Sequence, residues 1–172
     1  MQSVILDIGS GKESEAKLYW PDEEVHRLDS DESLNPDLLG TMQKIPAEDE
    51  SYERVLASHV LEHLPFMDVL DALKEVCRVL VKGGEFHLMV PSLEWAAREI
   101  LSETMSLVTI LHLYGTQTNE HQRHRTGFTM LMLRELLPLA GFSVAASQRS
   151  IYQVNIGDDL YEPEQHYMVG IK

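Results

Sequence analysis

The sequence predicts an α/β fold built on one doubly wound, mostly parallel sheet with helices on both faces and an antiparallel hairpin at its C-terminal end. Three observations lead to this fold class. Short apolar runs typical of buried strands alternate along the chain with helical patterns. A glycine turn follows the first run directly. The 172 residues suit a single domain, so 1–172 is expected to fold as one unit.

The first half of the chain supplies four expected strands. Residues 4–8 form an apolar, β-branched run that ends in the turn Gly9-Ser10-Gly11. Residues 25–28 form the second run, and the short crossover before it permits a small helix at most. Residues 38–39 are a weak third strand, and residues 54–58 read as the fourth.

The second half continues the alternation. Apolar positions from Phe66 to Leu80 follow helical spacing, and Gly83-Gly84 are expected to end this helix. Residues 86–90 then form a strand, and Ser92 is placed to cap the next helix. The remaining expected elements are helices at 107–113 and 130–140, and strands at 142–146 and 166–171 that flank an acidic loop at 157–164.

Charge and composition exclude several classes of partner. Fourteen basic and 28 acidic residues give a net charge of −14, which repels phosphate backbones and anionic lipid, and no basic patch offsets it. We therefore expect neither nucleic acid nor a membrane as partner. The single Cys77 makes no internal disulfide, and residues 1–3 do not resemble a signal peptide, so a cytoplasmic location is expected.

The candidate site is expected at the carboxyl ends of the strands, where ligands of open α/β sheets bind. Asp7 to Gly11, Asp29, and Ser58 with His59 should converge there. Gly9-x-Gly11 lets the backbone approach a ligand, and Asp29, 20 residues after Gly9, is placed to hold ribose hydroxyls.

The details of this loop favour a ligand with positive charge. A dinucleotide fits poorly, because Ser14 replaces the third glycine of the dinucleotide fingerprint and Glu13 would repel a pyrophosphate. Asp7 stands at the end of the first strand, where its carboxylate can pair with an ammonium such as that of S-adenosylmethionine. The alternative is that Asp7 only bonds loop amides and that the glycines only form a tight turn.

Four ordered blocks carry a resemblance to a known family. These are residues 5–11, Asp29, residues 50–64 and the Leu80-Val81-Lys82-Gly83-Gly84 turn. Together they resemble the class I, seven-strand, Rossmann-like methyltransferases that depend on S-adenosyl-L-methionine. The resemblance implies a seven-strand sheet, methylation as the reaction and S-adenosyl-L-methionine as the cofactor. It places cofactor binding at Asp7, Gly9, Ser10, Gly11, Asp29, Ser30, Thr41, Met42 and Ser58.

A later segment is similar to a subgroup of small predicted methyltransferases. Its blocks are Tyr114-Gly115 with Gln117, residues 124–129, Leu136-Leu137 and residues 140–142. That subgroup often accompanies cell-surface polysaccharide synthesis, which implies a small-molecule acceptor and O-methylation of a sugar or surface-glycan precursor. A substrate lid is expected at about 92–128, with Tyr114, His121 and Arg125 as substrate-binding residues. The alternative is that these residues and His124 lie on a solvated loop.

Three positions depart from the family pattern. Thr41 stands where the family has an acid near the adenine, which would leave the backbone and Met42 or Ile45 to hold the base. Glu13 replaces a loop glycine, and Glu53 replaces the aspartate that usually opens the fourth strand. The chain also starts at its first strand, without the N-terminal helices that cover the substrate in many relatives. The site is therefore expected to be open, or closed by a second copy in a homo-oligomer.

The acceptor side would contain the catalytic residues. A sulfonium is already an activated leaving group, so most of the rate must come from alignment of the acceptor. An oxygen acceptor would gain from a base, for which His59 is the first candidate and His124 the second. Alternatively His59 only hydrogen-bonds the loop, and Glu62 and His63 are expected to orient that loop.

Two rival functions remain open. Residues 59–63 spell H-x-x-E-H, the zinc motif of inverted metalloproteases, so a zinc-dependent hydrolase would use His59, Glu62 and His63, with His121 and His124 as possible further ligands. That motif needs a sustained helix, which the strand before it and Pro65 after it disfavour, so no metal is expected. The second rival is a non-catalytic protein of the same fold that binds the adenosyl cofactor.

Overall fold

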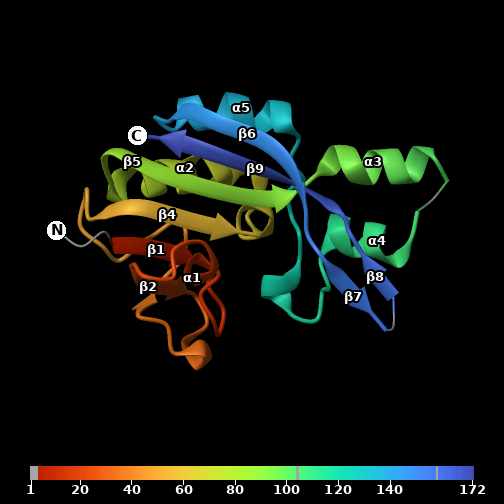
Figure 1. Ribbon diagram of the computed structural model, residues 1–172, viewed down its shortest axis with the longest axis horizontal. Helices are drawn as coiled ribbons and strands as arrows, with labels where there is room; N and C mark the ends of the chain where they lie inside the picture. The colour runs from red at the N-terminus through yellow and green to blue at the C-terminus, as the bar shows by residue number, and fades with distance from the viewer. Residues whose placement is uncertain (1–3, 104, 158) are drawn as a thin grey trace.

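The computed structural model describes residues 4–103, 105–157 and 159–172, and its centre is a seven-stranded sheet (Figure 1). The strand order is β3-β2-β1-β4-β5-β9-β6. The first five strands run parallel, and β9 pairs antiparallel with both β5 and β6. The strands are β1 (Val4–Ile8), β2 (Glu24–Asp29), β3 (Leu38–Leu39), β4 (Tyr52–Ser58), β5 (Leu80–Pro91), β6 (Ser143–Ile151) and β9 (Glu164–Ile171). The predicted fold class is confirmed.

The helices lie on both faces of the sheet and beyond one edge of it. Two of them, α2 and α5, cover one face, α1 lies over the other, and α3 and α4 lie beyond the carboxyl ends of the parallel strands (Figure 1). Their bounds are α1 (Ala16–Tyr19), α2 (Phe66–Val79), α3 (Leu93–Leu101), α4 (Leu107–Tyr114) and α5 (Met130–Leu139), with single 3-10 turns at η1 (Glu32–Leu34), η2 (Leu61–His63) and η3 (Glu120–Gln122). Within the described ranges, no helix has the length and apolar character needed to cross a membrane.

The first strand shows how the sequence pattern produces this layered arrangement. Leu6 and Ile8 point into the main core beneath α2 and α5, whereas Ile5 packs with Ala16 of α1 on the opposite face. Because both faces of β1 are covered, the strand reads as a continuous apolar run and not as an alternating one. Asp7 is the polar exception on the α1 face, and it belongs to the candidate site.

The expectation that Gly83-Gly84 end a helix is wrong. Helix α2 ends at Val79, and Leu80 is already extended, with φ −74° and ψ 141°. The pairing of β4 with β5 jumps from Tyr52↔Leu80 to Arg54↔Glu85, so the glycines lie in an irregularity within β5. Gly83 adopts φ +79°, which explains a glycine at a strand bulge instead of at a helix end.

The C-terminal region contains more strand than the sequence indicated. Strand β6 continues to Ile151, beyond the predicted end at 146. The expected acidic loop at 157–164 contains the strand β8 (Asp159–Tyr161), which pairs antiparallel with β7 (Val154–Ile156) just before the loop. Asp158 lies outside the described residues. The sequence did not reveal this ribbon because each of its strands has only three residues, too few for an alternating pattern to be recognised.

The predicted cap at Ser92 is confirmed and gives a first testable prediction. The Ser92 side chain accepts a hydrogen bond of 3.1 Å from the Trp95 backbone N–H at the start of α3. Ser92→Ala removes this acceptor, and we expect it to lower the free energy of unfolding by about 1 kcal/mol. Urea denaturation followed by circular dichroism measures the change, and an unaltered midpoint would show that the cap contributes nothing.

Candidate active site

The glycine turn after β1 is joined to the end of β2 by hydrogen bonds. Gly9 and Gly11 both adopt positive φ angles, +66° and +62°. The Gly9 backbone N–H donates to the Leu28 carbonyl at 2.8 Å, and the Gly11 N–H donates to Asp29 Oδ2 at 3.0 Å. The two segments that the sequence placed at one crevice therefore meet at the carboxyl edge of the sheet.

The surroundings of this turn leave room for a ligand on one side only. A Cβ atom on Gly9 would lie 2.6 Å from Cγ2 of Val60, whereas a Cβ on Gly11 would meet nothing within 4 Å. Ser10 is buried, and its hydroxyl has no hydrogen-bond partner among the described residues. A buried hydroxyl without a partner next to an open backbone turn fits a polar ligand held over Gly11.

Asp7 is hydrogen-bonded to the residues that follow this turn. Its Oδ2 accepts hydrogen bonds from the Ser14 hydroxyl at 2.6 Å and from the Ala16 backbone N–H at 3.2 Å. Burial raises the pKa of the Asp7 carboxyl above its usual value, although both hydrogen bonds act in the opposite direction. Asp7 therefore makes hydrogen bonds within the loop, which was the alternative to its pairing with an ammonium group.

Asp29 lies at the end of β2 with capacity for further hydrogen bonds. Its Oδ1 accepts from the Asp31 backbone N–H at 3.0 Å, and its Oδ2 accepts from Gly11. Each carboxylate oxygen can accept a second hydrogen bond. Asp29 is half-buried and the neighbouring Ser30 is exposed, so ligand hydroxyls can reach both.

The remaining predicted cofactor residues lie in different environments. Thr41 is exposed and forms a backbone bridge with Lys44. Met42 is 2% exposed and packs in the main core. Ser58 ends β4, is half-buried, and its hydroxyl lies 3.9 Å from the sulfur of Met89.

His59 follows β4 in a left-handed backbone conformation, with φ +54°. Its Nε2 donates to Oε1 of Gln165 at 2.7 Å, and its Nδ1 lies 3.3 Å from Oε1 of Glu62. The ring packs edge-on against Tyr152, with centroids 4.7 Å apart. Burial lowers the pKa of His59, but the close contact with the negatively charged Glu62 outweighs this effect, so the pKa is raised overall.

Glu62 is a buried acid, with a side chain only 2% exposed. Burial alone would raise the pKa of its carboxyl, but contact with His59 lowers the pKa below its usual value. Within the described ranges, neither carboxylate oxygen accepts a hydrogen bond of good geometry. The Glu62 carbonyl, in contrast, accepts from the Arg125 and Thr126 backbone N–H groups at 2.8 and 3.1 Å.

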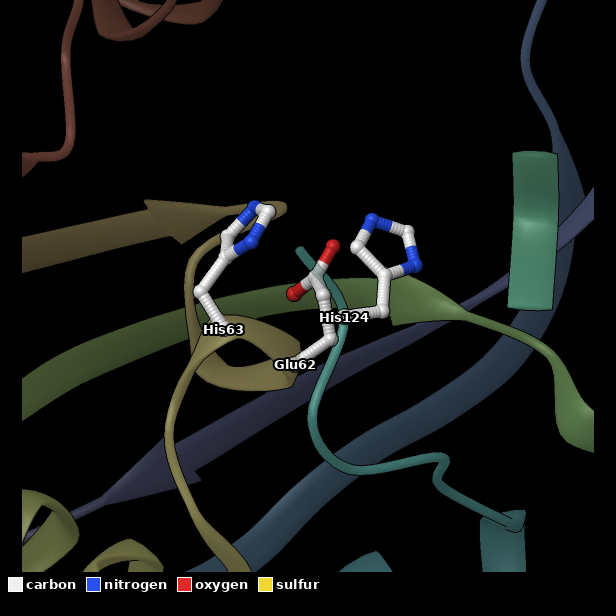
Figure 2. A group of neighbouring side chains, drawn as sticks. All are labelled: Glu62, His63 and His124. Carbon is white, nitrogen blue, oxygen red and sulfur yellow. The ribbon is translucent and has the colours of Figure 1, made fainter. Parts of the chain in front are cut away.

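Two further histidines face this acid (Figure 2). His63 Nδ1 lies 3.0 Å from the Arg123 carbonyl, and His124 Nδ1 lies 2.9 Å from the His112 carbonyl. Ligand atoms of Glu62, His63 and His124 all lie within 4.8 Å of one another. Burial lowers the pKa of His124, which favours its neutral ring at pH 7.

The helical zinc motif of a metalloprotease is not formed by residues 59–63. The turn η2 contains only three residues, and His59 lies outside it with a positive φ. His59 and His63 therefore do not share one face of a helix, as the H-x-x-E-H motif requires. The group that does come together combines Glu62 and His63 with His124 from a distant segment.

The expected substrate residues are all exposed: Tyr114 ends α4, and His121 and Arg125 lie on the segment that follows it. The pKa of Asp31, beside the predicted ribose-binding acid, is lowered chiefly by hydrogen bonds from Ser33 and also by the charge of His121.

Three partners in this region were not found from the sequence: His112, Tyr152 and Gln165. His112 bonds the Ser92 carbonyl and the Tyr152 hydroxyl, at 2.9 and 3.1 Å. They lie on α4, after β6 and on β9, and only the antiparallel return of β9 beside β5 brings Gln165 to His59. Because no local motif marks such long-range contacts, the sequence carried no signal for them.

Comparisons with known proteins place this geometry in context. Residues 6–88 match the family model described as a methyltransferase domain. A SAM-dependent methyltransferase from Methanosarcina mazei superposes with a TM-score of 0.71 at 18% identity, covering 99% of this chain and 92% of that one. No match was found among curated proteins.

Two other solved structures share the fold over 99% of this chain. The putative methyltransferase in complex with the Trm112 methyltransferase activator of Haloferax volcanii has a TM-score of 0.70 at 18% identity, with 82% of that chain covered. The 1,6-didemethyltoxoflavin-N1-methyltransferase of Burkholderia thailandensis, with bound S-adenosylhomocysteine, has a TM-score of 0.64 at 17% identity, with 71% of that chain covered. At these identities the likeness establishes the fold.

Proposed function

We propose that this chain, which has the fold of the class I S-adenosylmethionine-dependent methyltransferases and matches a methyltransferase domain over residues 6–88, methylates a small acceptor molecule. One observation carries the proposal. The open backbone turn at Gly11, with the unpartnered hydroxyl of Ser10 beside it, is hydrogen-bonded to Asp29 at the carboxyl edge of the sheet.

The cofactor residues of this chain have three tasks. We propose that Asp29, with Ser30 beside it, holds the ribose hydroxyls of the cofactor. Ser10 and the backbone of Gly9 and Gly11 line the methionine end of the cofactor. Asp7 supports the turn and attracts the ammonium group of the methionine. Thr41, Met42 and Ser58 complete the proposed contacts, with Thr41 and Met42 at the adenine. Because the Met42 side chain packs in the main core, its backbone is the proposed contact. S-adenosylmethionine supplies a methyl group already activated on a sulfonium, so the chain's main task is alignment.

The acceptor side is proposed to lie between the end of β4 and the segment 92–128. His59 stands one residue past β4, and the backbone N–H groups of Arg125 and Thr126 fasten the far end of that segment to Glu62. We propose that Tyr114, His121 and Arg125 contact the acceptor from this lid. The resemblance to a glycan-associated subgroup supports a hydroxylated acceptor such as a sugar. We also propose that the enzyme is cytoplasmic and that a second copy closes the open side of its site.

We propose that His59 positions the acceptor hydroxyl and takes its proton at Nε2 as the methyl group is transferred, with the acceptor replacing Gln165 at that nitrogen. Glu62, beside Nδ1, would stabilise the imidazolium that forms. His124 is the second candidate, because its Nδ1 bonds a carbonyl and its Nε2 keeps a lone pair.

The test is formation of S-adenosylhomocysteine with nucleotide sugars and other small hydroxylated compounds as acceptors. We expect His59→Ala to lower kcat by about 100-fold with cofactor affinity nearly unchanged, because general acid-base groups contribute roughly 10²- to 10⁴-fold. His26→Ala is the matched control, since His26 lies on β2 and bonds Tyr52. Normal turnover in His59→Ala would reassign the residue to loop structure.

A protein that binds the cofactor but methylates none of these acceptors would instead support the non-catalytic alternative.

A further inference from the structure

We infer that Glu62, His63 and His124 form a binding site for one divalent transition-metal ion at the carboxyl edge of the sheet. Residues 62 and 63 come from η2, directly after β4, and His124 comes from the segment that leads into α5. The inference concerns binding of an ion, and it goes beyond the proposed methyl transfer, which requires no metal.

The first support is the donor set and its spacing. Two imidazole nitrogens and one carboxylate oxygen are preferred ligands of zinc and of neighbouring transition metals. The three ligand atoms lie within 4.8 Å of one another, and the Glu62 carboxylate stands between the two rings (Figure 2). Bonds of about 2.1 Å place tetrahedral ligands roughly 3.4 Å apart, so small side-chain rotations would complete the site.

The second support is the orientation of the two rings. The His63 and His124 Nδ1 atoms each face a backbone carbonyl, at 3.0 and 2.9 Å. A carbonyl only accepts hydrogen bonds, so each Nδ1 carries the proton and each Nε2 keeps its lone pair. Metal-binding histidines are typically held in this way, with the second ring nitrogen donating to a carbonyl or a carboxylate.

The third support is the state of the carboxylate. Glu62 is 2% exposed, and across the described residues its two oxygens accept no hydrogen bond of good geometry. The Nδ1 atom of His59 lies 3.3 Å from Oε1 of Glu62, so His59 can offset the negative charge when its ring is protonated. His59 stabilises the buried charge, but both oxygens still lack a hydrogen bond of good geometry, and a divalent ion would supply the bonds that they lack.

The backbone already holds the two ligand segments together. The Arg125 and Thr126 N–H groups donate to the Glu62 carbonyl, and the Thr126 hydroxyl donates to the Leu64 carbonyl at 2.7 Å. His124 is thereby fixed opposite η2 without any ion. A preformed arrangement reduces the ordering that ion binding would otherwise require.

The neighbouring space suggests what an ion would do there. A small cavity borders Glu62 and His124 and is also lined by His112, Leu93 and Thr126. Three protein ligands leave at least one coordination position open, as in catalytic zinc sites. The cavity has room for about one water molecule, which is the natural ligand for that position.

The experiment uses the full chain after treatment with a chelator and removal of the chelator. Zn²⁺ is titrated by calorimetry without any cofactor, and Co²⁺ is titrated by visible absorption, which reports coordination by nitrogen and oxygen. We expect one ion per chain, and we expect the His63→Ala/His124→Ala variant to bind at least about 100-fold more weakly. His26→Ala, which removes a histidine far from the cluster, should bind like the wild type.

Glu62→Gln keeps the shape of the side chain and removes its charge. We expect a similar loss of metal affinity in this variant, together with a native circular dichroism spectrum. Absence of stoichiometric binding to the wild type, or binding that survives in both cluster variants, would overturn the inference. Binding of S-adenosylhomocysteine to the metal-free wild type, measured separately, tests the proposed function, so failure of one proposal is distinguishable from failure of the other.

Discussion

Asp29→Ala is expected to abolish measurable binding of S-adenosylhomocysteine while the protein remains folded. In the proposed complex Asp29 accepts charge-assisted hydrogen bonds from two ribose hydroxyls, each worth about 1.5–3 kcal/mol. Loss of both corresponds to at least about 100-fold in affinity, because 1.4 kcal/mol is a factor of ten. Titration calorimetry with the wild type and the variant measures the ratio directly.

The controls for this prediction separate charge from local structure. Asp29 also accepts from the Gly11 and Asp31 backbone N–H groups, so its removal could loosen the turn. Asp29→Asn keeps the size of the side chain and an acceptor oxygen for one of the two donors, so it should lose less affinity than Asp29→Ala. Asp71→Ala removes an exposed carboxylate on α2 and should bind normally. Wild-type affinity in Asp29→Ala would refute the ribose assignment.

Gly9→Ala is expected to cost about 2–5 kcal/mol of folding stability. A non-glycine residue in the left-handed region costs roughly 1–2 kcal/mol, and crowding adds about 1–3 kcal/mol. The crowding arises because the new Cβ would lie 2.6 Å from Cγ2 of Val60, a β-branched side chain with few alternative rotamers. Urea denaturation followed by circular dichroism gives the free energy of unfolding.

Gly11→Ala is the matched control for this clash. Gly11 has nearly the same φ, but its Cβ would meet nothing within 4 Å, so the expected cost is only about 1–2 kcal/mol. Removing the obstacle in Gly9→Ala/Val60→Ala should recover part of the loss relative to Val60→Ala alone. Equal costs at the two glycines would contradict the contact between the turn and Val60.

The fold was predictable where one local pattern decides the structure. The apolar run at Val4–Ile8, the helical periodicity of Phe66–Val79 and the cap at Ser92 each depend on neighbours in sequence. The errors occurred where tertiary pairing overrides the local signal. Gly83 looked like a helix terminator, but pairing with β4 draws its surroundings into a strand with a bulge.

The part of the candidate site that is proposed to bind the cofactor could be predicted from the sequence. The part around His59, proposed to bind the acceptor, was less predictable. The glycine turn and Asp29 are recognisable because each follows a strand at a fixed spacing. His59 was also identified, but its partners Gln165 and Tyr152 lie about 100 residues away along the chain. Burial of Glu62 depends on the fold of residues 123–128, which no short motif specifies.

Binding of an adenosyl cofactor by the wild-type chain tests the proposed function most directly. After chelation, the protein is melted alone and with S-adenosylmethionine, S-adenosylhomocysteine or NAD. At about 100 times its dissociation constant a ligand adds roughly 2.7 kcal/mol, or about 5–10 °C for a chain of this size. We expect this rise in Tm with both adenosyl compounds and none with NAD. No rise with either adenosyl compound, or an equal rise with NAD, would contradict the methyltransferase assignment.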